Sequence, residues 1–156
     1  MPELNNQNFN HLKIHTQYSI CEGAIKIDNL KDFCKEKKIP CLGISDTSNL
    51  CGALEFAENI SKVGTQPIIG TQIYFRFEDT TGLLPLIALN ENGYKRIIEL
   101  SSRSYLENDA LSDPHLDVKD LLIDTEGVSL LSGTIQGLFG KLFEKGRLDE
   151  ISKLYR

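Results

Sequence analysis

Alternating strand and helix patterns predict an α/β protein with a mostly parallel sheet or barrel. Short apolar segments alternate with amphipathic helical segments, and polar loops follow several of the apolar segments. The chain has 156 residues, of which 40% are apolar and 25% charged, as is usual for one folded core. We therefore expect a single domain over residues 1–156.

The first half of the chain carries the clearest repeat of strand, loop and helix. A strand should begin near Phe9 and run into a loop by Ser19, with His11, Lys13 and His15 on one of its faces. The later elements in this half are expected as follows: a helix from residue 27, capped by Asp28 and ended by Pro40, a buried strand at 41–45, a polar loop at 46–49 and a helix at 52–63.

The second half continues the alternation. Its expected elements are strands at 67–69 and 73–77 around a Gly-Thr-Gln loop, a strand at 84–89, a helix at 91–106, a short helix at 117–122, a strand at 128–131 and helical residues at 137–156. Functional groups in barrels lie on the loops that follow strands. Loops 16–23, 46–49, 70–72 and 132–137 should therefore converge on one end of the fold.

Charge and cysteine content limit the function classes. The net charge is −5 with dispersed basic residues, so any DNA partner should be bound mainly by other domains. The four cysteines lack zinc-site spacing and are expected to be buried or half-buried thiols in a reducing compartment. No signal-like start or membrane-length apolar run occurs, so we expect a cytoplasmic protein without a membrane partner.

The first strand looks like a metal site in which one ligand has been replaced. Alternate histidines at the end of a strand are typical of α/β metallohydrolases, but Lys13 stands between His11 and His15. A lysine ammonium competes with a cation and cannot bind one.

Five segments together resemble one family. They are H-L-K-I-H-T-Q-Y-S-I-C-E-G-A at 11–24, I-S-D-T-S-N-L-C-G-A-L-E-F at 44–56, Q-P-I-I-G at 66–70, L-I-A-L-N-E-N-G-Y-K at 86–95 and G-V-S-L-L-S-G at 127–133. Their order and spacing are similar to those of the polymerase and histidinol phosphatase (PHP) domain that opens the alpha subunit of bacterial DNA polymerase III. The resemblance covers about residues 9–146. It implies the N-terminal portion of a distorted (β/α)7 PHP barrel, truncated at its C-terminal side.

The resemblance also implies where metal ligands would stand in metal-bearing members. Those positions fall on Lys13, His15, Glu22, Thr47, Gln72, Leu83 and Thr134. Only His15 and Glu22 keep side chains that bind metals well, and hydrolytic clusters need three or more good ligands for each ion. We therefore expect no metal and no catalytic residue, with His15 and Glu22 as the residual metal candidates.

Two carboxylates complete the expected pocket. We hypothesise that Lys13 replaces a cation by pairing with Glu22 and with Asp46. Asp46 should also order its own loop through backbone amides, and His15 should be a hydrogen-bonded structural residue.

The function that the resemblance implies is that of a scaffold. The parent chain would be a replicative DNA polymerase, with Mg²⁺ held in a palm domain that this chain lacks. This domain would be catalytically inactive and would dock the proofreading exonuclease subunit among the other holoenzyme subunits. The alternatives are a metal-dependent phosphoesterase or 3′–5′ exonuclease with an altered ion set, and a free-standing α/β binding protein.

Overall fold

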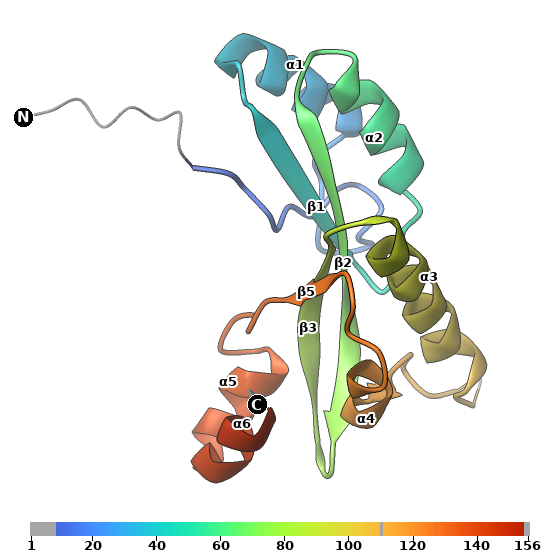
Figure 1. Cartoon of the computed structure of the whole chain (residues 1–156), viewed down its shortest axis with the longest axis vertical. Helices are drawn as coiled ribbons and strands as arrows, with labels where there is room; N and C mark the ends of the chain where they lie inside the picture. The colour runs from blue at the N-terminus through green and yellow to red at the C-terminus, as the bar shows by residue number, and fades with distance from the viewer. Residues whose placement is uncertain (1–8, 110, 155–156) are drawn as a thin grey trace, which may run out of the picture.

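A five-stranded mixed sheet organises the molecule (Figure 1). The computed structural model describes residues 9–109 and 111–154. The strands in this part are β1 (Cys41–Thr47), β2 (Gln66–Phe77), β3 (Thr80–Ala88), β4 (Leu116–Asp117) and β5 (Val128–Leu130). The helices are α1 (Ile27–Lys37), α2 (Ala53–Ser61), α3 (Glu91–Leu106), α4 (Val118–Leu122), α5 (Leu138–Glu144) and α6 (Leu148–Leu154).

The sheet combines parallel and antiparallel pairs. Strand β2 lies parallel to β1 and to β4, whereas β3 lies antiparallel to both β2 and β5. A two-residue connection, Glu78 and Asp79, joins β2 to β3, and Glu78 adopts the left-handed conformation at φ 53° that tight hairpin turns require. The α/β class is confirmed, with a hairpin at the centre of the sheet.

Strand β2 is longer than the sequence indicated. We expected a loop at 70–72, but β2 runs continuously through these residues. They pair with β1 on one side and with β3 on the other, so their backbone groups are satisfied within the sheet. Gly70 is needed there for close approach, because a Cβ atom would lie 2.5 Å from the Leu86 carbonyl oxygen.

The expected first strand is reduced to isolated contacts. Ile14 forms a parallel bridge with Ile44, and Thr16 forms one with Ile25. Two backbone hydrogen bonds hold this segment against β1, from Gly43 N to His11 O at 2.7 Å and from Ser45 N to Ile14 O at 2.8 Å. The segment therefore follows β1 without making a regular ladder.

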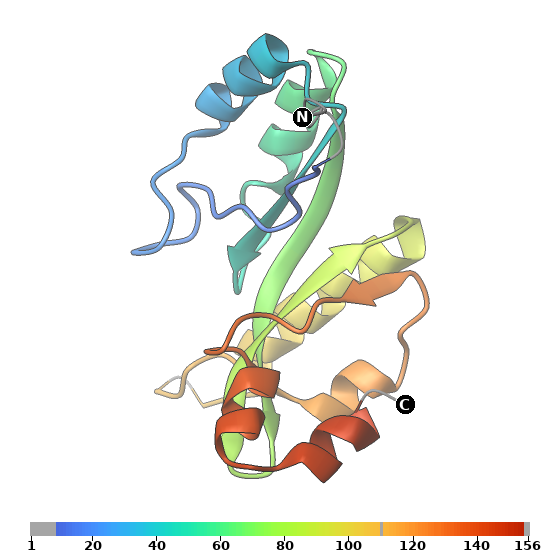
Figure 2. The same cartoon turned by 90° about the vertical axis from the view of Figure 1, so that its left-hand side faces the viewer.

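Two apolar clusters form the core. One joins α1 and α2 to β1, and its largest members include Ile27, Phe56 and Ile60. The other packs α3, α4 and α5 against β2 and β3. Figures 1 and 2 show α3 and the α5–α6 pair on opposite sides of the β2–β3 hairpin, with β2 running through both parts of the molecule.

Helix boundaries depend on local capping. In α3 the Asn90 side chain accepts a hydrogen bond from Gly93 N at 2.9 Å, as an N-cap should. The expected cap of α1 by Asp28 is wrong, because Lys26 occupies the N-cap and Asp28 pairs with Lys31 at 3.2 Å. The helical segment expected at 137–156 is two helices, α5 and α6, separated near Gly146 at φ 72°.

In the described residues, no helix has the length and apolarity to span a membrane.

Candidate functional site: a polar cluster at the end of β1

Asp46 is the centre of a buried polar cluster. It lies near the end of β1 with 1% of its surface exposed. Its Oδ1 accepts hydrogen bonds from Thr16 N at 2.6 Å and Ser19 Oγ at 2.7 Å, and its Oδ2 accepts one from Thr16 Oγ1 at 2.7 Å. We expected Asp46 to bind amides of its own loop, and this was wrong. It fastens the loop that precedes α1 to β1 instead, and Figure 2 shows that loop beside the arrowhead of β1.

The loop at 16–23 is tightly folded around this carboxylate. Thr16 and Ser19 are buried, and Ser19 Oγ also accepts a hydrogen bond from Thr47 N at 3.1 Å. Gly23 N donates to Ser19 O at 2.9 Å. Only glycine fits at position 23, since a Cβ atom would lie 2.0 Å from Thr16 O. The loop is therefore fixed at both of its ends.

A second chain of contacts joins four of the predicted pocket residues. Thr47 Oγ1 donates a short hydrogen bond to Glu22 Oε2 and accepts one from Gln72 Nε2 at 2.7 Å. His15 Nδ1 lies 3.8 Å from the same Glu22 oxygen and 3.4 Å from Ser19 Oγ. The structure thus brings His15 and Glu22, from the segment before α1, together with Thr47 at the end of β1 and Gln72 in β2.

Leu83 and Thr134 do not join this chain of contacts. Leu83 pairs with Tyr74 across the β2–β3 hairpin and bridges to Gly137. Thr134 is exposed, and its Oγ1 accepts a hydrogen bond from Gln136 N at 3.3 Å. Among the described residues, neither side chain has a hydrogen bond to the four residues above. Their contacts place them with β3 and the segment that leads to α5.

The electrostatic role expected for Lys13 is wrong. No carboxylate in the described part of the chain forms an ion pair with Lys13, whereas Glu22 contacts His15. Asp46 has three hydrogen-bond donors and Glu22 has the Thr47 hydroxyl, so both carboxylates are satisfied by other groups. His11, the other member of this strand face, is exposed and packs edge-on against Phe9 at 4.7 Å between ring centroids.

Sequence reasoning missed a second layer around the cluster. Tyr18 Oη donates to Glu55 Oε2 at 2.5 Å, and this contact, followed by desolvation, raises the pKa of Tyr18 above its usual value. Asn49 Nδ2 donates to Tyr18 O and Thr47 O, at 3.0 and 2.9 Å. Sequence reasoning also missed the donors to Asp46. The hydroxyls of Thr16 and Ser19 were the available signal for them, because a hydroxyl group can donate a hydrogen bond to a buried carboxylate.

The residues present do not fit a metal centre. Within 9–109 and 111–154 there is no group of three or more His, Cys, Asp or Glu side chains placed to hold an ion. Both oxygens of Asp46 are taken by protein donors. Near the cluster, the buried atoms Gln72 Oε1 and Ser45 Oγ have no hydrogen-bond partner among the described residues. The carboxylates of this cluster accept hydrogen bonds and hold the loop at 16–23 in place. The cluster lacks the ligands that lower the pKa of a metal-bound water.

Comparisons with known proteins give consistent matches. The family model described as "PHP domain" matches residues 11–156. The DNA polymerase III subunit alpha of Caulobacter vibrioides is 37% identical over 161 residues, covering 97% of this chain and 14% of that protein. The same subunit of Thermus aquaticus is 34% identical over 155 residues, covering 90% of this chain and 13% of that protein. The chain thus spans only a small part of the length of these relatives.

Two solved structures share the fold. A protein from Bifidobacterium adolescentis, described as a metal-dependent phosphoesterase, superposes with a TM-score of 0.50 at 17% identity, over 64% of this chain and 34% of that one. An amidohydrolase from Chromobacterium violaceum gives a TM-score of 0.51 at 14% identity, over 62% of this chain and 33% of that one. At these identities the likeness concerns the fold alone.

Proposed function

The chain belongs to the PHP domain family, and from this premise we propose that it is the PHP region of a replicative DNA polymerase III alpha subunit. The observation that carries the proposal is 37% identity to such a subunit over 97% of the chain. The resemblance inferred from the five sequence segments is confirmed at the family level. Template-directed nucleotide addition, with its Mg²⁺ ions, and most DNA binding would then belong to other domains of the parent protein.

Within that subunit we propose that this domain is a catalytically inactive scaffold. The support is the donor set at the end of β1: a threonine hydroxyl and a glutamine amide lie where the resemblance implies metal ligands. Neither side chain is an anionic or imidazole ligand. Gln72 donates a hydrogen bond to Thr47, and Thr47 donates one to Glu22, so a structural role accounts for their contacts.

Metal binding and phosphodiester hydrolysis test the inactivity. We expect isothermal titration calorimetry with Zn²⁺ or Mn²⁺ to show no tight binding of two or more ions. We also expect no turnover of bis(p-nitrophenyl) phosphate above that of the His15→Ala variant. Tight binding of two ions, together with turnover that His15→Ala abolishes, would establish the rival function of a metal-dependent phosphoesterase or 3′–5′ exonuclease.

The partner we propose is the proofreading exonuclease subunit. An alpha subunit without its own hydrolytic centre requires proofreading from another protein, and a loop held to β1 by several hydrogen bonds suits a domain that serves as a platform. Purified exonuclease subunit should co-elute with this chain in size-exclusion chromatography and bind it in calorimetry. If the same exonuclease binds the full-length alpha subunit but not this chain at tens of micromolar, the docking proposal is wrong.

We also propose a cytoplasmic location, in keeping with a role in replication. All four cysteines are free thiols, as a reducing compartment favours. Only Cys34 is buried and Cys41 half-buried, so the expected burial is wrong for Cys21 and Cys51, which are exposed.

A further inference from the structure

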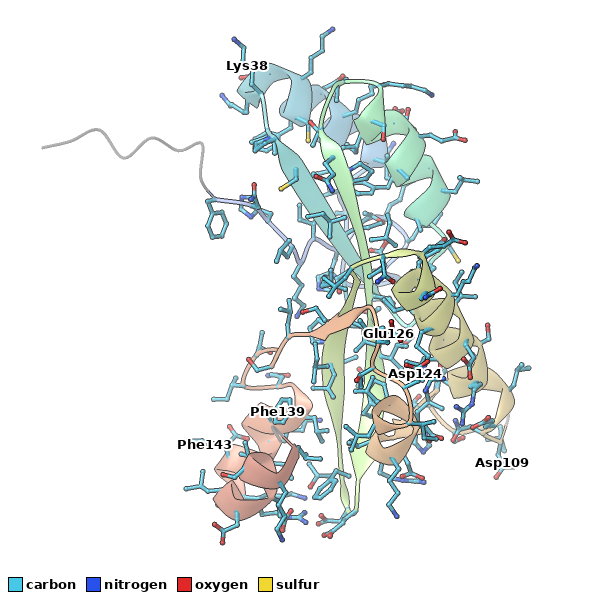
Figure 3. All side chains as sticks on the ribbon, in the orientation of Figure 1. Lys38, Asp109, Asp124, Glu126, Phe139 and Phe143 are labelled. Atoms are coloured by element: carbon cyan, nitrogen blue, oxygen red, sulfur yellow. The ribbon has the colours of Figure 1, made fainter. Side chains whose placement is uncertain are left out.

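A pocket away from the polar cluster combines exposed aromatic side chains with lysines. It lies between the segment at 9–11 and the C-terminal end of α1, with a volume of about 330 Å³. Its apolar walls are Phe9, Phe33, Ile39 and Pro40, of which Phe9 is 68% exposed and Phe33 42% exposed. Figure 3 shows Lys38 at this end of α1, away from the lower helices. The pocket therefore offers exposed aromatic surface at the end of α1, outside the polar cluster at the end of β1.

The backbone holds the two sides of this pocket in place. Gly43 N donates to His11 O at 2.7 Å, and a Cβ atom at position 43 would lie 2.9 Å from Leu12 Cα. The glycine thus lets the N-terminal segment approach β1 closely. On the other side, Lys38 ends α1 in the left-handed conformation at φ 53°, and Ile39 N donates to Cys34 O at 3.1 Å.

The charge at the pocket is positive in a chain that is negative as a whole. Lys37 and Lys38 line it beside His11, and among residues 9–109 and 111–154 no acidic side chain lines it. Lys35, Lys37 and Lys38 carry three positive charges against one negative charge on Glu36, which pairs with Lys37 at 2.8 Å. The C-terminal dipole of α1 offsets only about half a charge. A net positive rim therefore remains, while the net charge of the chain is −5.

We propose that this pocket binds an extended acidic segment of a partner protein in which a carboxylate neighbours a large apolar side chain. The apolar side chain would lie against Phe9 and Phe33, and the carboxylate would pair with Lys37 and Lys38. A volume near 330 Å³ suits a few side chains and not a folded surface. The proposal does not depend on the exonuclease assignment, because it rests on the chemistry of this pocket alone.

Fluorescence polarisation with short labelled peptides tests the proposal. The probe is Gly-Asp-Asp-Leu-Phe-Asp-Gly, compared with a peptide in which Asn replaces each Asp and with one in which Ala replaces Leu and Phe. We expect saturable binding of the first peptide by the chain, weakened about tenfold or more in each altered peptide. No binding of the first peptide up to millimolar protein, or equal binding of all three, would overturn the proposal.

Variants of the protein locate the contact. Lys37→Gln/Lys38→Asn and, separately, Phe33→Ala should each weaken binding about tenfold. The matched controls are Lys26→Gln/Lys62→Gln, which removes the same charge elsewhere, and Leu54→Ala on the exposed face of α2; both should bind within twofold of the parent chain. Circular dichroism checks that each variant is folded. If neither pocket variant weakens peptide binding, the peptide binds elsewhere. If the chain binds oligodeoxythymidine more tightly than the peptide and the pocket variants weaken that binding, the pocket is a nucleic-acid site instead.

Discussion

At the scale of single residues, the polar cluster depends on which side chains donate hydrogen bonds to the carboxylates of Asp46 and Glu22. His15, Glu22, Thr47 and Gln72 were placed in one pocket by the family resemblance, and they are neighbours in the structure although Gln72 lies inside β2 and His15 in a segment without a regular ladder. The error concerned Lys13, where a single charge was expected to balance two carboxylates. Neutral hydroxyl and amide donors from a loop perform that task, and sequence spacing does not reveal which rotamers turn inward.

Asp46 should be the most costly carboxylate to remove. Asp46→Ala leaves one amide and two hydroxyls without their buried acceptor, so we expect a loss of about 3 kcal/mol in the free energy of unfolding. Asp46→Asn keeps one acceptor oxygen and should lose about 1 kcal/mol. Urea denaturation measures both. Asp28→Ala, on the exposed surface of α1, is the control and should change stability by less than about 0.5 kcal/mol. A similar small loss for Asp46→Ala would show that the loop is held by other contacts.

The four thiols should differ widely in reactivity. Cys34 is 1% exposed, and burial raises the pKa of its thiol, so the reactive thiolate is scarce at neutral pH. Cys21 and Cys51 are exposed. Labelling with iodoacetamide at pH 7.5, followed by peptide mass spectrometry, should modify Cys21 and Cys51 first and Cys34 only after denaturation. Fast labelling of Cys34 in the folded chain would mean that α1 opens away from the sheet.

At the scale of elements, the helix α3 was predicted more accurately than the strand β2. The helix expected at 91–106 is α3 with the same bounds, and in the structure Asn90 caps its start. The same reasoning failed for β2, where Gly70 suggested a loop. Gly70 is needed for close approach to Leu86 on the neighbouring strand β3. A contact between strands cannot be read from the residues around Gly70 in the sequence.

Gly93 in α3 gives a test in which helix propensity and packing oppose each other. Alanine in a helix normally stabilises by about 1 kcal/mol relative to glycine. Here a Cβ atom would lie 1.7 Å from Gly127 O, a backbone atom that cannot move without disturbing the start of β5. We expect Gly93→Ala to lower the free energy of unfolding by about 2 kcal/mol. Asn92→Ala, at an exposed neighbouring position, should not do so. Thermal unfolding would contradict this account if Gly93→Ala were as stable as the parent chain.

At the scale of the whole molecule, β2 couples the two apolar clusters. Residues 70–72 pair with β1 and β3 at once, so neither cluster can lose its part of β2 without disturbing the other. The hydrogen bonds of Thr71 and Gln72 to residues of β1 and its following loop strengthen this junction. The mostly parallel sheet expected from strand and helix order did not reveal the central hairpin, because two strands in succession carry no local sign of their direction.

This coupling predicts a single unfolding transition. Ile60, in α2, is fully buried in the cluster that joins α1 and α2 to β1, so Ile60→Ala should lower the free energy of unfolding by about 3 kcal/mol. Because β2 is shared, hydrogen exchange should accelerate in the amides of β3 and α3 as well as in those of β1. Leu100→Ala, in the other cluster, should produce the same pattern in reverse, with faster exchange in β1. If Ile60→Ala affected only α1, α2 and β1, then the clusters would unfold independently and β2 would not transmit stability between them.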